Sequence, residues 1–115
     1  MTKRAVFNKV AKHLLTQNCK STGDIGCMYR GYQGTSCAIG CLIPDKLYDR
    51  SMEGGFDEVI DKLEDKGAIN LVKCFKDNSD MLLNLQAVHD FTYVSEWRTE
   101  LDKLAKKLKI IRPEY

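Results

Sequence analysis

A run of nine residues near the middle of the chain constrains the fold most strongly. Positions 37–45 read CAIGCLIPD, so small, sulfur-bearing and apolar residues are packed together and then followed by a proline. Small residues let backbone segments approach closely, and proline ends regular structure because it lacks a backbone N–H. Most of the other unusual residues of the chain fall within positions 27–54 as well. We therefore expect this stretch to form either a tightly packed knot or a built site.

Length and composition indicate one globular domain over residues 1–115. The chain is 43% hydrophobic and 30% charged, and its formal net charge is only +2, which gives no general electrostatic case for binding nucleic acid. No apolar run reaches the roughly twenty residues that a membrane span needs, and the N-terminus lacks a secretory pattern. We expect a cytoplasmic protein without a membrane partner.

The five cysteines, at positions 19, 27, 37, 41 and 74, are odd in number. Without a secretory signal, free thiols are the default expectation. Unpaired cysteine behaves as a small buried hydrophobe, and apolar neighbours surround Cys41 and Cys74. These two thiols are therefore expected in the core.

Apolar residues recur at helical spacing in most of the chain. Residues 3–17 show one apolar face at i, i+3 and i+4, and residues 56–63 show another that Gly67 would stop. A shorter apolar piece covers 69–75, Asn78 or Ser79 caps a helix that ends near His89, and Ser95 opens a last helix with its apolar positions at 97–108. The pattern predicts four or five helices.

The middle of the chain permits two interpretations. Residues 27–29 have the composition of a short strand, and a second hairpin arm at 37–43 could follow a turn at 33–36. Ser36 could equally cap a short helix over 37–42. The predicted class is α+β, a mostly helical domain with a short β-hairpin or an irregular segment rich in cysteine and glycine.

A zinc site is one chemical hypothesis. Cys37 and Cys41 have three residues between them, which lies within the range of a zinc knuckle, and Cys27 with His89 or His13 could complete the ligands. No second knuckle exists, and Cys41 lies in an apolar run. Structural thiols are therefore favoured over metal.

A cysteine nucleophile is the second hypothesis. Cys37 could lie at a helix start, where the dipole would favour the thiolate, and His89 with Asp90 offers a base and an orienting acid. A histidine at the end of an amphipathic helix is more often a dipole partner or a packing group. This hypothesis depends on His89 reaching Cys37.

Polar residues beside glycines, proline and helix ends form a third set. They could bind a ligand, or they could tie loops down, and an ion pair from Arg30 to Asp45 or Glu53 would do the latter. Arg30 beside Tyr29 and Tyr32 could also stack on a base or on an aromatic partner. We favour the structural role. The set is Arg30, Asp45, Glu53, His89 and Asp90.

The C-terminal helix carries lysines at positions 103, 106, 107 and 109 between leucines. This pattern is typical of an amphipathic helix with a solvated face. Contact with a membrane or with nucleic acid is the minority interpretation.

The order and spacing of several short motifs resemble those of a family of small uncharacterised proteins encoded by bacteriophages and some bacteria. The motifs read C-x-YRG at 27–31, CAIGCLIPD-x-x-Y at 37–48, MEG at 52–54 and LQ-x-x-HD at 85–90, with a tryptophan at 97. The resemblance implies an accessory phage gene product. Small products of that kind often bind and block a host protein, and this analogy carries no site of its own.

We therefore expect a non-catalytic binding protein that acts on, or inhibits, a host or defence protein in the host-cell cytoplasm, with no cofactor. A homo-oligomer is compatible with this hypothesis. The alternatives are an enzyme or zinc protein centred on Cys37 and His89, and a nucleic-acid-binding protein. The expected binding residues are Tyr29, Arg30, Tyr32, Asp45, Tyr48 and Glu53.

Overall fold

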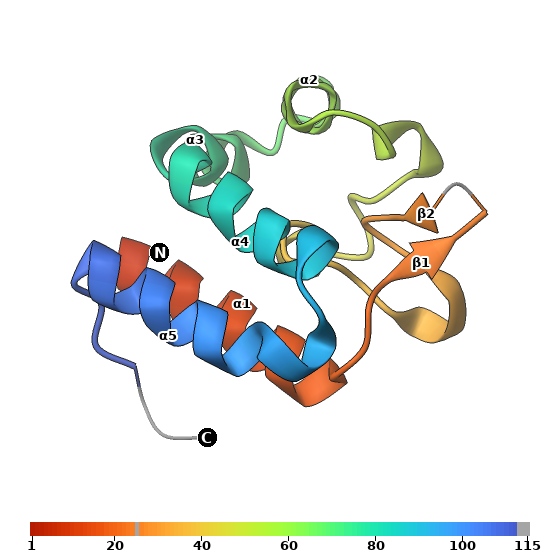
Figure 1. The fold of residues 1–115 in the computed structure, drawn as a ribbon. Coiled ribbons are helices and arrows are strands. Elements are labelled where there is room, and N and C mark those ends of the chain that lie inside the picture. Colours follow the sequence, from red (N-terminus) through yellow and green to blue (C-terminus); the bar gives the residue numbers. More distant parts are fainter. Residues whose placement is uncertain (25, 113–115) are drawn as a thin grey trace.

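The computed structural model describes residues 1–24 and 26–112, and in that part of the chain five α-helices surround one cluster of buried residues (Figure 1). The fold is a mostly helical α+β arrangement, as the sequence predicts. The helices are α1 (Lys3–Gln17), α2 (Phe56–Asp65), α3 (Ile69–Asp77), α4 (Ser79–Phe91) and α5 (Trp97–Leu108).

Helices α1, α4 and α5 pack against one another and supply half of the residues of the buried cluster. The predicted apolar face of α1 is buried at Val6, Phe7, Val10, Ala11 and Leu14. The Thr2 hydroxyl accepts the N–H of Ala5 at 3.1 Å and caps the start of α1. Helical periodicity therefore located these elements correctly.

Helices α2 and α3 form a second pair at the other side of the middle segment. Helix α2 buries Val59, Ile60 and Leu63. Gly67 follows it with φ of +74°, a left-handed conformation that glycine adopts without a side-chain clash. The predicted stop at Gly67 is confirmed.

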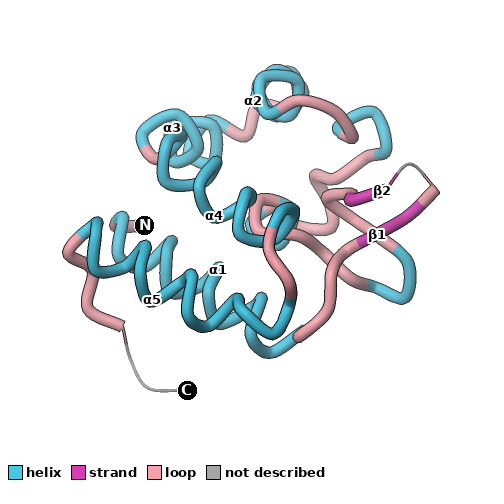
Figure 2. Tube along the Cα trace, in the orientation of Figure 1, coloured by secondary structure: helices cyan, strands magenta, loops and turns pink. Residues whose placement is uncertain are grey.

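The middle of the chain contains the predicted short hairpin, but its arms differ from the suggested 27–29 and 37–43 (Figure 2). The hairpin consists of β1 (Thr22–Gly23) and β2 (Gly26–Cys27), so the partner of Cys27 is Thr22 and not a residue of 37–43. Residues 30 and 36 form only an isolated bridge. The chain between them turns back in the short 3-10 helix η1 (Tyr32–Gly34), with Gln33 and Gly34 both at positive φ, and the pairing does not continue.

Residues 37–43 form a tight turn that ends in the 3-10 helix η2 (Gly40–Leu42), which is closer to the helical alternative. The Cys37 N–H donates to the Tyr29 carbonyl at 3.2 Å. A Cβ at Gly40 would overlap the Tyr29 carbonyl oxygen and lie 2.7 Å from its carbonyl carbon. The small residues of this run therefore serve a close backbone approach.

Two further 3-10 helices complete the described chain, η3 (Arg50–Met52) before α2 and η4 (Val94–Glu96) before α5. None of the described helices has both the length and the apolar character needed to cross a bilayer.

Candidate functional site

The carboxylate of Glu53 connects three segments of the middle region. Its Oε1 accepts the N–H of Tyr29 at 2.8 Å, and its Oε2 accepts the N–H of Arg30 at 3.1 Å and the hydroxyl of Tyr48 at 2.6 Å. The Tyr29 hydroxyl donates to the Gly54 carbonyl at 2.7 Å. A carboxylate that accepts several donors forms charge-assisted bonds, which are stronger than neutral ones. The segment after β2 is thus fixed to the segment before α2.

Arg30 extends this network to the proline-ended turn. Its guanidinium donates to the Asp45 carboxylate at 2.6 Å and to the carbonyl of Ile43, and it lies 5.1 Å from the centre of the Tyr48 ring. Burial, together with the hydrogen bond to Glu53, raises the pKa of Tyr48 to about 12. We call the set of Tyr29, Arg30, Asp45, Tyr48 and Glu53 the Glu53 network.

Five of the six residues expected to bind a partner thus belong to one internal network. Tyr29 is buried, whereas Asp45 is exposed. The sixth residue, Tyr32, is 58% exposed and donates its hydroxyl to Asp24. Arg50 approaches the same aspartate at 3.5 Å. The outer face therefore carries Tyr32, Asp45 and Arg50, and Asp45 is the exposed member of the Glu53 network.

The second group of chemically active side chains joins Cys27 of β2 to His89 and Asp90 of α4. Their potential ligand atoms lie within 4.8 Å of one another. Cys37 and Cys41 do not belong to this group, although sequence reasoning paired them with His89. These two thiols bond within their own turn instead. The Sγ of Cys37 accepts the N–H of Gly40 at 3.3 Å, and the thiol of Cys41 donates to the Ala38 carbonyl at 3.1 Å.

Both nitrogens of the buried His89 ring already have partners. Ser21 donates its N–H to Nε2 at 2.9 Å, and Nδ1 lies 2.6 Å from Oδ1 of Asp90. Because an N–H faces Nε2, that nitrogen holds the lone pair and the proton resides on Nδ1, which donates to the carboxylate. Gln86 donates to the same oxygen at 2.9 Å. Burial opposes ionisation of Asp90, but these hydrogen bonds outweigh it and lower its pKa.

This arrangement does not favour the nucleophile hypothesis. Burial raises the pKa of the Cys37 thiol to about 12, which opposes the thiolate that this hypothesis requires. Burial and the negative charge of Asp90 also raise the pKa of Cys27. A catalytic cysteine needs a lowered pKa or a free base nearby. The lone pair of His89 that could act as a base is already an acceptor for Ser21.

The geometry does not favour the zinc hypothesis either. A histidine binds metal through a ring nitrogen that holds a free lone pair. In His89, Nε2 receives the Ser21 N–H and Nδ1 carries a proton. The ring instead ties the start of the hairpin to α4, so a metal at Nε2 would first have to displace the Ser21 N–H.

A cavity of about 180 Å³ lies between the two groups. Its lining includes Cys27, Tyr29, Glu53, Gln86 and Asp90. Gln86 links the 37–43 turn to Asp90, since its Oε1 accepts the N–H of Ile39 at 3.0 Å while its amide donates to Asp90. Sequence reasoning missed Gln86 and Ser21 as contributors. The spacing of Gln86 to Asp90, one helical turn, was the available signal for Gln86, whereas nothing local marks Ser21.

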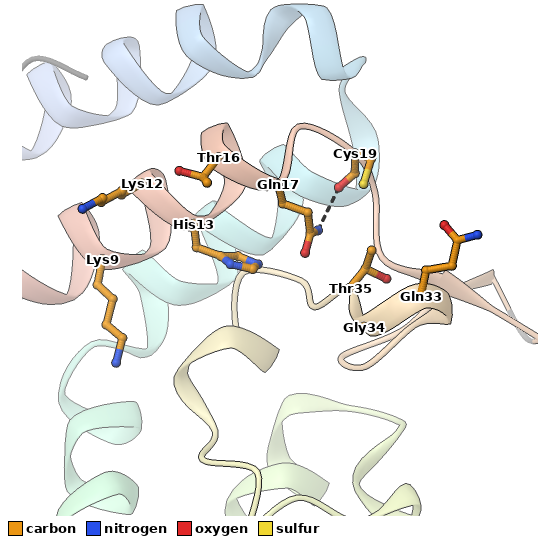
Figure 3. Close-up of a pocket in the computed structure, with 9 residues that line it drawn as sticks. All are labelled: Lys9, Lys12, His13, Thr16, Gln17, Cys19, Gln33, Gly34 and Thr35. Carbon is orange, nitrogen blue, oxygen red and sulfur yellow. Dashed lines mark hydrogen bonds between the residues drawn. The ribbon is translucent and has the colours of Figure 1, made fainter.

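A larger hollow of about 640 Å³, the α1 groove, lies between α1 and the loop that carries η1 (Figure 3). His13 and Gln17 project from α1 toward the loop that carries Thr35, while Lys9 and Lys12 extend from the preceding turn. This groove was not expected from the sequence. Its lining is Lys9, Lys12, His13, Thr16, Gln17, Cys19, Gln33, Gly34 and Thr35.

Comparison of the chain with protein-family models, with curated proteins and with solved structures returned no match.

Proposed function

We propose that the chain is a non-catalytic binding protein, of the accessory kind that phages encode, that acts on a host-cell or defence protein. The contact surface of this proposal is the outer face of residues 28–54, with Tyr32, Asp45 and Arg50 among its exposed members. The Glu53 network is the observation that carries the proposal.

The network supports binding because it fixes the contact surface before a partner arrives. Glu53 alone holds two backbone N–H groups and one hydroxyl. Loops that are ordered in advance lose less conformational entropy on association, which leaves more of the interaction energy as affinity. Tyrosine and arginine are also the side chains that carry much of the energy of protein interfaces.

The group formed by Cys27, His89 and Asp90 also supports a non-catalytic role. His89 and Asp90 use their hydrogen-bonding capacity on Ser21 and Gln86, inside the protein. Buried polar groups that satisfy one another in this way stabilise a particular packing. Their role in the proposal is to hold the hairpin and the middle segment against α4.

Affinity capture tests the proposal. A tagged chain is expressed in bacterial cells, recovered and analysed by mass spectrometry, beside Tyr32→Ala and Phe91→Ala variants. Both side chains are exposed, at 58% and 83%, so each variant should keep its stability within about 0.5 kcal/mol. We expect one protein to be captured in comparable amounts by the parent chain and by Phe91→Ala, and to be lost with Tyr32→Ala.

A captured protein that survives the Tyr32 change but disappears with Phe91→Ala would place the surface elsewhere. The absence of any protein that depends on either side chain would overturn the proposal itself.

A further inference from the structure

We propose that the α1 groove binds an acidic, partly aliphatic segment of the partner protein. This inference rests on the proposed function and names the chemistry of the partner at a part of the surface that adjoins Tyr32. Gln33, Gly34 and Thr35 of the groove directly follow Tyr32 in the chain, so one partner can contact both.

Charge is the first argument. Residues 1–23 contain five lysine and arginine residues and no aspartate or glutamate, although the whole chain is nearly neutral. Among the described residues, neither Lys9 nor Lys12 forms an ion pair or a side-chain hydrogen bond, and no carboxylate lines the groove. Unpaired cations around a hollow attract anionic partners and steer their approach.

Rigidity is the second argument. The side-chain NH2 group of Gln17 donates to the carbonyl of Ser36 at 3.0 Å, and the side-chain oxygen of Gln17 accepts the backbone N–H of Ser36 at 3.0 Å. Nε2 of His13 donates to the same carbonyl at 2.8 Å. These bonds fasten the loop wall of the groove to the helix wall. The groove is therefore formed before a partner enters, which reduces the entropy lost on binding.

The backbone at the rim is the third argument. Gln33 has φ of +59° and ψ of +31°, a left-handed conformation that costs a residue with a side chain about 1 kcal/mol. Its side chain is exposed and lines the groove. Strain of this kind persists where the surroundings maintain it, and it clusters at sites that contact ligands.

The lining favours a peptide over a nucleic acid. Single-stranded nucleic acid is held by bases stacked on aromatic rings and by several cations along its backbone. The only ring in the groove, among the described residues, belongs to His13, which is held to Ser36, and only two unpaired lysines lie along it. The lysine stems, the Thr16 methyl group and Cys19 instead offer aliphatic contacts between the charges.

A fluorescein-labelled peptide that alternates glutamate and leucine tests the inference by fluorescence anisotropy at about 50 mM salt, where screening is weak. Lys9→Gln combined with Lys12→Gln should weaken binding about fivefold to tenfold, because two charge contacts are lost. The matched control combines Lys103→Gln with Lys106→Gln, which removes the same charge at the same helical spacing on α5. It should change the affinity less than about twofold.

Three results would overturn the inference. They are equal weakening by both double variants, tighter binding of a single-stranded oligonucleotide of matched charge, and peptide binding that persists when a bulky maleimide blocks the exposed Cys19. The capture experiment separates this inference from the proposed function. A partner that is lost with Tyr32→Ala but retained by the Lys9 and Lys12 double variant would support the proposed function. The same result would contradict the inference that the α1 groove binds an acidic segment.

Discussion

At the scale of single residues, Glu53 accepts hydrogen bonds from backbone N–H groups that have no other acceptor among the described residues. Tyr29 and Arg30 leave the hairpin with backbone N–H groups that have no strand opposite them, and the two carboxylate oxygens accept both. A buried N–H without an acceptor is costly, so this one side chain allows an irregular segment to lie against the core.

Glu53→Gln should destabilise the protein by about 2 kcal/mol, because the amide group offers one acceptor oxygen and turns N–H donors toward the other donors. Urea denaturation measures the loss. Glu58→Gln is the control, since Glu58 is exposed in the first turn of α2, and it should cost no more than about 0.5 kcal/mol. Equal effects of the two changes would contradict the role given to Glu53.

The reactivity of the cysteine thiols toward a disulfide reagent should follow their exposure in the native protein. Cys19 and Cys27 are exposed and should react within the native state, whereas Cys37 is fully buried and should react only when the protein unfolds. Mass spectrometry of the labelled peptides assigns each thiol. Fast native labelling of Cys37 would revive the catalytic alternative.

At the scale of elements, the turn over residues 37–43 depends on how closely it approaches the backbone of Tyr29. Gly40→Ala should destabilise the protein by about 2 kcal/mol or more, because its Cβ would overlap a backbone carbonyl that cannot rotate away. Thermal or urea unfolding of the variant provides the measurement.

Gly55→Ala is the matched control for this prediction. A Cβ at Gly55 would meet no atom within 4 Å, and its φ of −70° is one that alanine adopts freely. A poorer helix cap and a less flexible unfolded chain offset each other, so the net change should be within about 0.5 kcal/mol. A neutral Gly40→Ala would show that the turn is not tightly packed against Tyr29.

The elements that the sequence predicts well are those whose signal is local. The apolar spacing of Val6, Val10 and Leu14 and the position of Gly67 depend only on neighbours in the chain, and both predictions are confirmed. A short hairpin is present, but its arms are residues 22–23 and 26–27, and the possible pairing of 27–29 with 37–43 is reduced to an isolated bridge between residues 30 and 36, because strand partners are decided by tertiary contacts. The ion pair of Arg30 with Asp45 was anticipated, but the convergence of Tyr29, Tyr48 and Glu53 was not.

The candidate site shows the same division. Its members Ser21, Cys27, Gln86 and Asp90 come from the hairpin region and from α4, which the sequence alone does not bring together. Both the hairpin and the 37–43 turn reach this end of α4, the turn through the Ile39 N–H and Gln86, but it is Cys27 whose sulfur lies near His89 and Asp90. The sequence offered Cys27, Cys37 and Cys41 alike as neighbours of His89, and it could not single out Cys27.

At the scale of the whole molecule, the burial of thiol and phenol groups makes the free energy of unfolding decrease as the pH rises in the alkaline range. Burial raises the pKa of both Cys37 and Cys41 to about 12, and it raises the pKa of Tyr29 as well. Unfolded thiols ionise near about 8.5 and unfolded phenols near about 10. A raised pKa in the folded state stabilises the protein fully below the unfolded pKa, and this contribution is lost as the pH rises above it.

The urea midpoint should therefore stay constant up to about pH 8 and fall steadily toward about pH 11, as the unfolded chain releases protons that the folded chain keeps. Replacing Cys37 by alanine should reduce the slope of that fall even if it also lowers stability at neutral pH. A midpoint that is flat to about pH 11 would show that these groups ionise equally in both states.

The central claim is that residues 28–54 are a scaffold that presents a contact surface, and photo-crosslinking in cells tests it most directly. Benzoylphenylalanine is placed at Tyr32, on the proposed surface, or at Phe91, the most exposed large apolar side chain among the described residues. The account predicts a covalent adduct with one cellular protein at position 32 and little or none at position 91. An adduct formed only at position 91, or none at either position, would contradict it.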